Sequence, residues 1–404
     1  MEKYNSYKDS GFAWMGQIPS HWETRRFRFL LAENSTQNTE LKERKQLQFK
    51  YGDIVPKANQ SEDKDVLDTI KKYTVVAPGD IMINGLNLNY DFISQRVARV
   101  REPGVITSAY VSLRPLEGAN SKYYTYYMKA MDAQKMFHGM GSGVRLTLSY
   151  DNLKNLFFPY PSPEEQDAMV AYLDAATAKI DEAIAQQQRM IDLLNERKHI
   201  IIFNAITKGL NESAGLKESG IKWIGSIPIH WGLRRLKHIA RLQSGDSINS
   251  DSFTEEGYPV YGGNGFRGYT SSFTNDGDYV LIGRQGALCG NVNYAHGQFF
   301  ASEHAVVVYP YQDEPLIWLG ESIRVSNLNQ YSQSAAQPGL AVSTIANIYY
   351  PYPPREERQS ISEYIEKNIT IFDNCIAHSN RMISLLQERK QIIINEVVTG
   401  KVRV

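Results

Sequence analysis

An internal repeat limits the possible folds of this chain more than any other feature. Residues 9–27 (DSGFAWMGQIPSHWETRRF) recur as residues 218–236 (ESGIKWIGSIPIHWGLRRL) at an offset of 209. The offset then falls to 198 for residues 79–83, to 195 for the apolar run that ends at Pro115, and to 192 for residues 157–210. A falling offset is expected when a duplicated architecture has shorter loops in its second copy. The sequence therefore predicts two similar halves in tandem.

Each copy combines a mixed segment with a long helical segment. With 404 residues, the chain is long enough for two or three domains that each bury a core. Short β-rich runs alternate with Gly, Asn and Asp turns in the mixed segments, which predicts α+β domains with a twisted sheet. We place the first mixed domain at residues 1–158 and the first helical segment at 159–210. The second mixed domain spans 211–348, and the second helical segment spans 349–404.

The first helical segment carries both a start and a stop signal. Residues 162–165 (SPEE) have the pattern of a capping box with proline at the first helical position, and Gly209 stands where a helix would end. A helix of about 45 residues is roughly 67 Å long, against an average of about 11 residues in globular proteins. The second copy has Pro354 in place of Ser162, so its start signal differs.

One face of each predicted helix is apolar at spacings of three, four and seven residues. Two such stripes are most readily buried against each other, which predicts a coiled coil. Gln187 and Ser379 interrupt the stripes at equivalent positions, where a tolerated polar residue is favoured over a register-setting one. The predicted seam consists of Met169, Leu173, Ile180, Ile184, Ile191, Leu194, Ile201, Ile361, Ile365, Phe372, Ile376, Ile383, Leu386 and Ile393.

Polar side chains follow the Gly-Asp strand of each copy. Asparagine and glutamine can bond adenine bidentately and arginine can bond guanine, so side chains of this kind can read base edges. Glycines around them permit close approach of the backbone to a ligand. For any single residue, a role as an ordinary turn residue is about equally favoured. The candidate DNA-binding residues are Asn84, Asn87, Asn89 and Arg145 in the first copy, and Tyr261, Asn264, Arg267, Arg284 and Gln285 in the second.

The sequence contains no recognisable catalytic motif. It has no Gly-x-x-x-x-Gly-Lys-Ser/Thr phosphate loop and no Asn-Pro-Pro-Tyr or Asp-Pro-Pro-Tyr segment of adenine methyltransferases. Residues 263–268 fit Gly-x-Gly-x-x-Gly, but no helix start follows, so a surface loop is favoured over a dinucleotide site. Cys289, His296, Glu303 and His304 fit no standard zinc spacing. We expect no catalytic residue, no bound cofactor and no metal in this chain, and structural hydrogen bonds for His21 and His230.

Composition restricts the class of protein further. The chain has 44 basic and 44 acidic residues, although residues 1–158 lean basic, so a nucleic-acid ligand would require local patches or partner subunits. No stretch is apolar enough to span a membrane, and the first ten residues are too polar for a signal peptide, so we expect a cytoplasmic protein. The two cysteines, Cys289 and Cys375, are expected to be reduced and packed in the core.

The combined motifs resemble the specificity subunit of type I restriction-modification systems. The marks are Trp-x-Gly-x-Ile-Pro-x-His-Trp at 14–22 and 223–231, the Pro-x-Pro helix entrances at 159 and 351, Leu-Leu-x-Glu-Arg-Lys at 193 and 385, and YPVYGGNG at 258–265. The resemblance spans the whole chain. It implies two target recognition domains, each reading one half of a split double-stranded DNA site, separated by two long antiparallel helices.

The same resemblance implies partners. The helical regions would dock two modification subunits that carry S-adenosylmethionine and methylate adenine, and restriction subunits that hydrolyse ATP with Mg²⁺ would join them. Two other classes compete with this interpretation. A self-contained DNA methyltransferase would need the motifs that are missing, and a coiled-coil scaffold would show no sequence-selective DNA binding.

Overall fold

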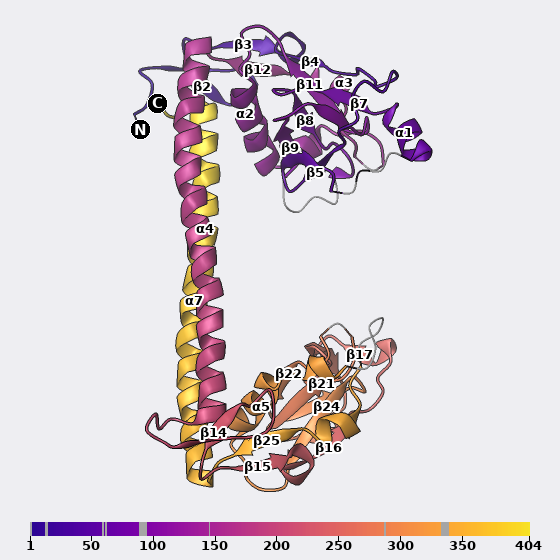
Figure 1. The fold of residues 1–404 in the computed structure, drawn as a ribbon. Coiled ribbons are helices and arrows are strands. Elements are labelled where there is room, and N and C mark those ends of the chain that lie inside the picture. The colour runs from indigo at the N-terminus through magenta and orange to yellow at the C-terminus, as the bar shows by residue number, and fades with distance from the viewer. Residues whose placement is uncertain are drawn as a thin grey trace. The chain divides into compact units, whose positions relative to one another are not determined.

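The computed structural model describes residues 2–12, 15–58, 60, 63–88, 95–144, 146–286, 288–332 and 339–404 (Figure 1). Its contacts divide into two compact units. The first unit contains Met1–Gln187 with Arg381–Val404, and the second contains Gln188–Asn380. Each unit therefore holds one mixed segment together with parts of both long helices.

The core of the first unit is an antiparallel four-stranded sheet. Its order is β4 (Leu31–Glu33), β11 (Val111–Pro115), β8 (Ile81–Ile83) and β9 (Val97–Arg99). Helix α2 (Ser121–Ala133) packs beside β9, and its buried tyrosines fill the space between the sheet and the long helices. The smaller elements are the pairs β5 (Leu47–Lys50)–β6 (Asp53–Pro56) and β7 (Thr74–Val76)–β10 (Gly104–Ile106), and the helices α1 (Lys64–Ile70) and α3 (Tyr150–Leu153).

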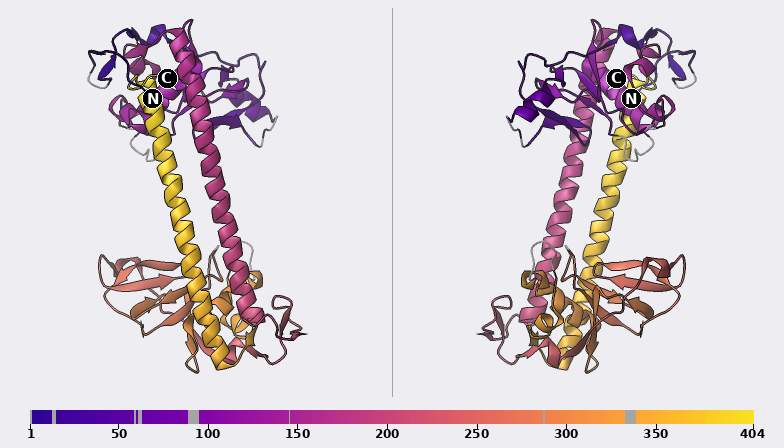
Figure 2. Two further views of the ribbon diagram at one scale, coloured as in Figure 1. Left: turned by 90° about the vertical axis from the view of Figure 1, so that its left-hand side faces the viewer. Right: turned by 90° about the vertical axis from the view of Figure 1, so that its right-hand side faces the viewer.

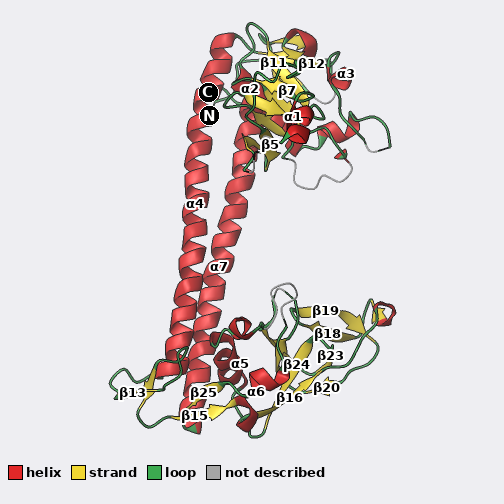
Figure 3. Ribbon diagram, turned by 45° about the vertical axis from the view of Figure 1, so that its right-hand side comes forward, coloured by secondary structure: helices red, strands yellow, loops and turns green. Residues whose placement is uncertain are grey.

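The second unit repeats this sheet with the same order and connections. The equivalent strands are β16 (Ala240–Ser244), β24 (Ala305–Pro310), β21 (Tyr279–Gly283) and β22 (Val292–Ala295). A second sheet, without a counterpart among the described residues of the first unit, has the order β17 (Phe253–Thr254), β19 (Gly265–Thr270), β18 (Tyr258–Gly262), β23 (Gln298–Ala301) and β20 (Asn275–Asp276) (Figure 3). Helices α5 (Leu316–Val325) and α6 (Val342–Ala346) complete the unit.

Strand pairing refines one offset of the repeat. Ile83 lies opposite Val111 and Val97, whereas Ile282 lies opposite Val306 and Val292. Ile83 and Ile282 are therefore equivalent, at an offset of 199 instead of the 198 that the Gly-Asp match indicates. The second copy accommodates one more residue between its Gly-Asp turn and the equivalent point of the strand.

Each unit has the same framework around the start of its long helix. Short hairpins, β1 (Tyr7–Asp9)–β2 (Gln17–Pro19) and β13 (Leu216–Glu218)–β14 (Ser226–Pro228), lead into two further strand pairs, β3 (Glu23–Arg26)–β12 (Phe157–Tyr160) and β15 (Gly232–Arg235)–β25 (Tyr349–Tyr352). The guanidinium carbon of Arg25 lies 3.6 Å from the centre of the Tyr160 ring, and that of Arg234 lies 4.0 Å from Tyr352. The repeated arginine is thus a cation–π partner of the repeated tyrosine.

Acceptors on the long helices hold the His-Trp pair of each opening motif. His21 Nε2 lies 2.8 Å from Glu165 Oε1, and Trp22 Nε1 donates to the same oxygen at 3.4 Å. In the second copy both His230 and Trp231 bond Glu357, at 2.7 and 2.9 Å. The structural role expected for the two histidines is confirmed. Trp14 of the opening motif lies outside the described residues.

The two long helices begin at equivalent positions despite different caps. Helix α4 runs over Pro163–Lys208, and α7 runs over Arg355–Val398. In the first, Ser162 Oγ accepts from Glu165 N and Glu165 Oε2 accepts from Ser162 N, both at 3.3 Å, so the predicted capping box is present. Pro354 replaces that cap without moving the helix start. Gly209 has φ +74°, the left-handed conformation expected at a helix end.

All fourteen predicted seam residues are buried or half-buried, and within each unit α4 and α7 lie side by side (Figure 2). In the first unit the cluster around Met169 and Leu173 includes Ile393 and Val397 of α7. In the second, Ala205 and Ile206 share a cluster with Ile361 and Ile365. Early α4 residues thus contact late α7 residues, and late α4 residues contact early ones. The predicted fold class, two mixed domains with two long antiparallel helices, is confirmed.

Two smaller expectations have different outcomes. Cys289 is buried, at 1% exposure, whereas Cys375 is exposed on α7, so the expected core position of Cys375 is wrong. In the sequence, Cys375 stands between the seam residues Phe372 and Ile376, but its side chain lies on a different face of the helix.

No helix in the described part of the chain is long and apolar enough to cross a membrane.

Candidate nucleic-acid interface

The loop that follows β8 is the candidate interface of the first unit. Asn84 is half-buried, and its side-chain oxygen accepts from Leu86 N at 3.3 Å, which closes a local turn. Asn87 is exposed and has φ +50°, a left-handed conformation that asparagine tolerates better than most residues. Leu88 is fully buried. Asn89 and Arg145 lie outside the described residues.

The backbone of this loop packs closely against the backbone at Leu148. A Cβ atom on Gly85 would lie 2.3 Å from Leu148 O, so only glycine fits there without a shift of the backbone. The backbone also pairs at both sides of the loop: Leu148 N donates to Gly85 O at 2.9 Å and Leu88 N donates to Leu146 O at 3.1 Å. The loop is therefore held at its base, while its exposed side chains are free to meet a ligand.

In the second unit, three predicted residues line one hollow. Asn264 comes from the turn between β18 and β19, Arg267 comes from β19, and Gln285 comes from the segment after β21. Asn291 Nδ2 donates to Asn264 Oδ1 at 3.0 Å, which orients that amide. The complete lining is Gly263, Asn264, Gly265, Phe266, Arg267, Gln285, Gly286 and His304.

Glycines bring the two sides of this hollow together. A Cβ atom on Gly283 would lie 1.9 Å from Gly263 O, so the end of β21 and the β18–β19 turn touch backbone to backbone. The Gly-x-Gly-x-x-Gly stretch at 263–268 is consequently a strand-to-strand turn and the start of β19. The prediction that this stretch is a surface loop is only partly right, because most of it belongs to the sheet.

Two other predicted residues do not line the hollow. Arg284 is half-buried, and its Nη1 donates to Ser244 Oγ at 2.9 Å. Its Nε is buried without a hydrogen-bond partner among the described residues. Tyr261 packs its ring edge-on against Phe299, with ring centres 5.7 Å apart. The side chains of Arg284 and Tyr261 are therefore engaged beside the hollow and are not part of its lining.

His304 lines the hollow but was not predicted as a binding residue. Its Nε2 lies 3.1 Å from Glu303 Oε1 of the neighbouring residue, and its backbone oxygen accepts from Arg284 N at 3.0 Å. In the sequence, His304 stands out only as one of four residues whose spacing fits no standard zinc site. Among the described residues, no group of three or more His, Cys, Asp or Glu side chains is arranged to hold a metal ion.

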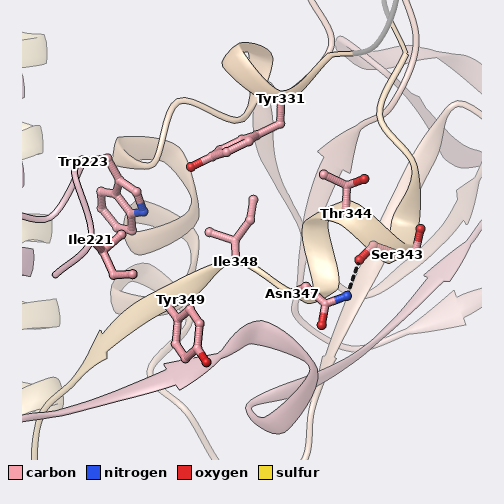
Figure 4. A pocket seen from close by; sticks show the side chains of 8 residues that line it. All are labelled: Ile221, Trp223, Tyr331, Ser343, Thr344, Asn347, Ile348 and Tyr349. Carbon is pink, nitrogen blue, oxygen red and sulfur yellow. Dashed lines mark hydrogen bonds between the residues drawn. The ribbon is translucent and has the colours of Figure 1, made fainter. Parts of the chain in front are cut away.

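A different hollow of the second unit belongs to the shared framework (Figure 4). Trp223 of the opening motif lines it beside Ile221, Tyr331 and Tyr349, and Asn347 Nδ2 donates to Ser343 O at 2.8 Å on its opposite side. In the first unit Phe12 occupies the place of Ile221, and its ring stacks on Phe157 at 5.0 Å. Because the lining of this hollow comes from the shared framework, we do not assign it to recognition.

The chain matches the family model described as "Type I restriction modification DNA specificity domain" over residues 19–189 and again over 228–387. It is 38% identical over 156 residues to the type I restriction enzyme EcoprrI specificity subunit of Escherichia coli, a match that covers 37% of this chain and 39% of that protein. It is 23% identical over 367 residues to the MjaVIII specificity subunit of Methanocaldococcus jannaschii, covering 82% of this chain and 81% of that protein.

The fold also has a solved counterpart. A chain from a structure described as "Structural basis underlying complex assembly and conformational transition of the type I R-M system" aligns with a TM-score of 0.72. The alignment covers 95% of this chain and 99% of that one, at 15% sequence identity. The two chains therefore share this fold although only 15% of their aligned residues are identical.

Proposed function

The chain belongs to the type I restriction-modification DNA specificity family, and we propose from this premise that it reads a split double-stranded DNA site, one half with each unit. The observation that carries the proposal is that the two units share one sheet but differ in the polar loops at the same end of β8 and β21. A common framework with different side chains at one position is what two readers of different half-sites require.

The two candidate surfaces differ in chemistry. The first presents Asn87 on a loop after β8, whereas the second presents Arg267, Gln285 and Asn264 around a hollow. Amides pair well with adenine and guanidinium groups with guanine, so the two halves should prefer different bases. Phosphate contacts would add affinity without sequence information, and partner subunits would supply part of the positive charge.

The experiment is to map methylated adenines in cells that express this chain with its modification and restriction subunits. Asn87→Ala should relax selectivity in one half-site only, and Arg267→Ala or Gln285→Ala in the other. One lost bidentate contact corresponds to about 1 to 3 kcal/mol of discrimination against the wrong base. Arg284→Ala, which removes a residue beside the hollow, should act on the same half-site as Gln285→Ala. A continuous site, or one substitution that alters both halves, would contradict the proposal.

We also propose that the long helices dock two copies of a modification subunit. Each helix carries an exposed apolar stripe beside its seam: Met190, Leu193 and Ile200 on α4, and Met382, Leu385 and Ile392 on α7. The members of one stripe are related to those of the other by the 192-residue offset of the repeat. Exposed apolar side chains on one face of a helix are typical of a surface that a partner covers.

This stripe predicts a stoichiometry. Leu193→Glu should remove one modification subunit from the assembly, Leu385→Glu should remove the other, and the double variant should bind neither. Native mass spectrometry of the purified assemblies would count the subunits. Tyr51→Glu, which changes an exposed residue of the first mixed domain, is the control and should leave the composition unchanged. Unchanged assembly in the double variant would refute the docking proposal.

We propose, finally, that this chain is not catalytic, with S-adenosylmethionine, ATP and Mg²⁺ bound by the partner subunits. The absence of methyltransferase and phosphate-loop motifs from the sequence supports this division of labour. Calorimetric titration of the isolated chain with S-adenosylmethionine should give no binding heat. Methyl transfer by the purified chain alone would favour a self-contained methyltransferase instead.

A further inference from the structure

Arg96 lies directly before β9 and is almost completely buried, with 8% of its surface exposed. Its guanidinium group donates to three backbone carbonyl oxygens of the loop after β8. Nη1 donates to Asn84 O at 2.8 Å and to Leu86 O at 2.7 Å, and Nη2 donates to Asn87 O at 3.1 Å. One planar cation therefore holds the backbone of residues 84–87 at three points.

The backbone of Arg96 is fixed independently of its side chain. Its N–H donates to Asp132 Oδ2 of helix α2 at 2.8 Å, and its carbonyl oxygen accepts from Asn84 N at 2.8 Å. Asp132 is itself buried, at 1% exposure. Arg96 thus connects residues 84–87 to both the sheet and α2.

This arrangement determines what the loop can present. Because the three carbonyls point to the guanidinium group, Leu86 and Asn87 are left exposed on the other side of the turn. Asn87 also has φ +50°, a conformation that is costly unless the surroundings hold it. Arginine suits this task because its donors are fixed in a planar fork, whereas lysine offers a single ammonium group.

In the second unit, Asn291 is the counterpart of Arg96. Asn291 O accepts from Gly283 N at 2.8 Å, just as Arg96 O accepts from Asn84 N. The Asn291 side chain then donates to Asn264 Oδ1, a residue of the recognition hollow. The residue before β9 or β22 therefore contacts candidate interface residues in both units: the loop after β8 in the first unit and the β18–β19 turn in the second.

We propose that Arg96 is a specificity-determining positioning residue: it fixes the loop 84–88 in the conformation that reads the first half-site, without touching DNA. The proposal rests on the proposed function of this loop. Burial of the guanidinium group separates Arg96 from an arginine that contacts phosphate, because such a contact would require an exposed cation and would change the salt dependence of binding.

The test uses the complete assembly with its modification subunits and compares Arg96→Lys and Arg96→Met. Competition binding with DNA duplexes that vary in one half-site at a time measures discrimination. We expect Arg96→Met to lose about tenfold in discrimination at the first half-site, within the range that one base contact supplies. Arg96→Lys should be intermediate. Discrimination at the second half-site, non-specific affinity and its salt dependence should stay unchanged in both variants.

Arg114→Lys is the matched control. Its guanidinium group bonds the Asp80 carboxylate at 3.0 and 2.8 Å, at the opposite end of β8 from the loop. The Arg114→Lys substitution alters a charged hydrogen-bond network of the same sheet. Its discrimination between DNA sequences at both half-sites should equal that of the unaltered chain. Equal losses at both half-sites, or an unchanged first half-site in folded Arg96→Met, would overturn the proposal.

Amide hydrogen exchange provides a readout that needs no DNA. In Arg96→Lys, the amides of residues 84–88 should exchange faster, while those of 281–285 in the second unit should not change. If exchange is unaltered, Arg96 does not hold the loop and the positioning role fails. If exchange rises as expected but the unaltered assembly selects no DNA sequence, the positioning role stands and the proposed function fails.

Discussion

Lys390 donates hydrogen bonds to both carboxylate oxygens of Asp181, at 2.6 and 2.7 Å, and so joins α7 to α4 within the first unit. The second unit contains the same pair in reverse: Lys198 of α4 donates to Asp373 of α7 at 2.7 Å. Asp181 and Asp373 are separated by 192 residues, as are Lys198 and Lys390. One duplicated pair of residues therefore aligns the two helices antiparallel in both units.

Exchanging the two charges of the Asp181–Lys390 pair should distinguish the attraction within the pair from general effects of charge on stability. Asp181→Lys should destabilise the chain, and Lys390→Asp added to it should restore most of the loss. The aspartate is 56% exposed, so a double-mutant cycle should give a coupling of about 0.5 kcal/mol. Thermal unfolding at low and high salt would measure it, and the coupling should shrink with salt. A coupling that is zero at low salt would show that the pair does not stabilise the helices.

A charge introduced into the seam should lower the stability of the chain far more than a charge in the exposed apolar stripe beside it. Leu386→Asp places a carboxylate in a half-buried apolar contact, so we expect a loss of about 2 kcal/mol or more and a lower melting temperature. Leu194→Asp should act similarly in the second unit. Leu385→Asp and Leu193→Asp change exposed neighbours and should leave the melting temperature almost unchanged. Equal effects of Leu386→Asp and Leu385→Asp would show that the seam is wrongly placed.

The backbone contact between the two sides of the second hollow predicts a strict requirement for glycine. Gly283→Ala puts a methyl group 1.9 Å from Gly263 O, so the strand and the turn must separate. We expect a destabilisation of about 1 to 3 kcal/mol together with loss of second half-site selectivity. Gly232→Ala is the control, since a Cβ there meets nothing within 4 Å. Crystallographic or solution data showing an unmoved turn in Gly283→Ala would contradict this account.

Buried tyrosines predict unfolding in alkali. Burial raises the pKa of Tyr126 to about 12, and it also raises the pKa of Tyr123 and of Tyr124 well above the usual range. An unfolded tyrosine titrates near 10, so this contribution to stability is complete below about pH 10 and is lost as the pH rises through the folded values. Phenolate absorbance of buried tyrosines should therefore appear together with loss of helical circular dichroism.

Replacing one buried tyrosine tests this account. Tyr126→Phe should shift the unfolding transition to higher pH, because the folded chain then holds one phenol fewer whose ionisation burial opposes. Ionisation of all tyrosines in one step, with the helical signal unchanged, would mean that α2 is not packed as described.

The sequence by itself determined the duplication, the fold class and the helical seam. Helix caps, a 192-residue offset and an apolar face are local or periodic signals, so Pro163 and Gly209 could be identified as helix limits from their neighbours alone. The same signals could not reveal that α7 starts at Arg355, because Pro354 stands where the serine cap of α4 has its counterpart.

Only the tertiary structure decided which polar residues share a surface. Asn264, Arg267 and Gln285 meet because two glycines let β21 touch a turn of another sheet, a contact between segments about 20 residues apart that no spacing encodes. Arg284, by contrast, turns to Ser244, and Tyr261 packs on Phe299. Arg96 gave no signal as a lone arginine before a short strand. Its role follows from three carbonyl oxygens that converge on it only when the hairpin has formed.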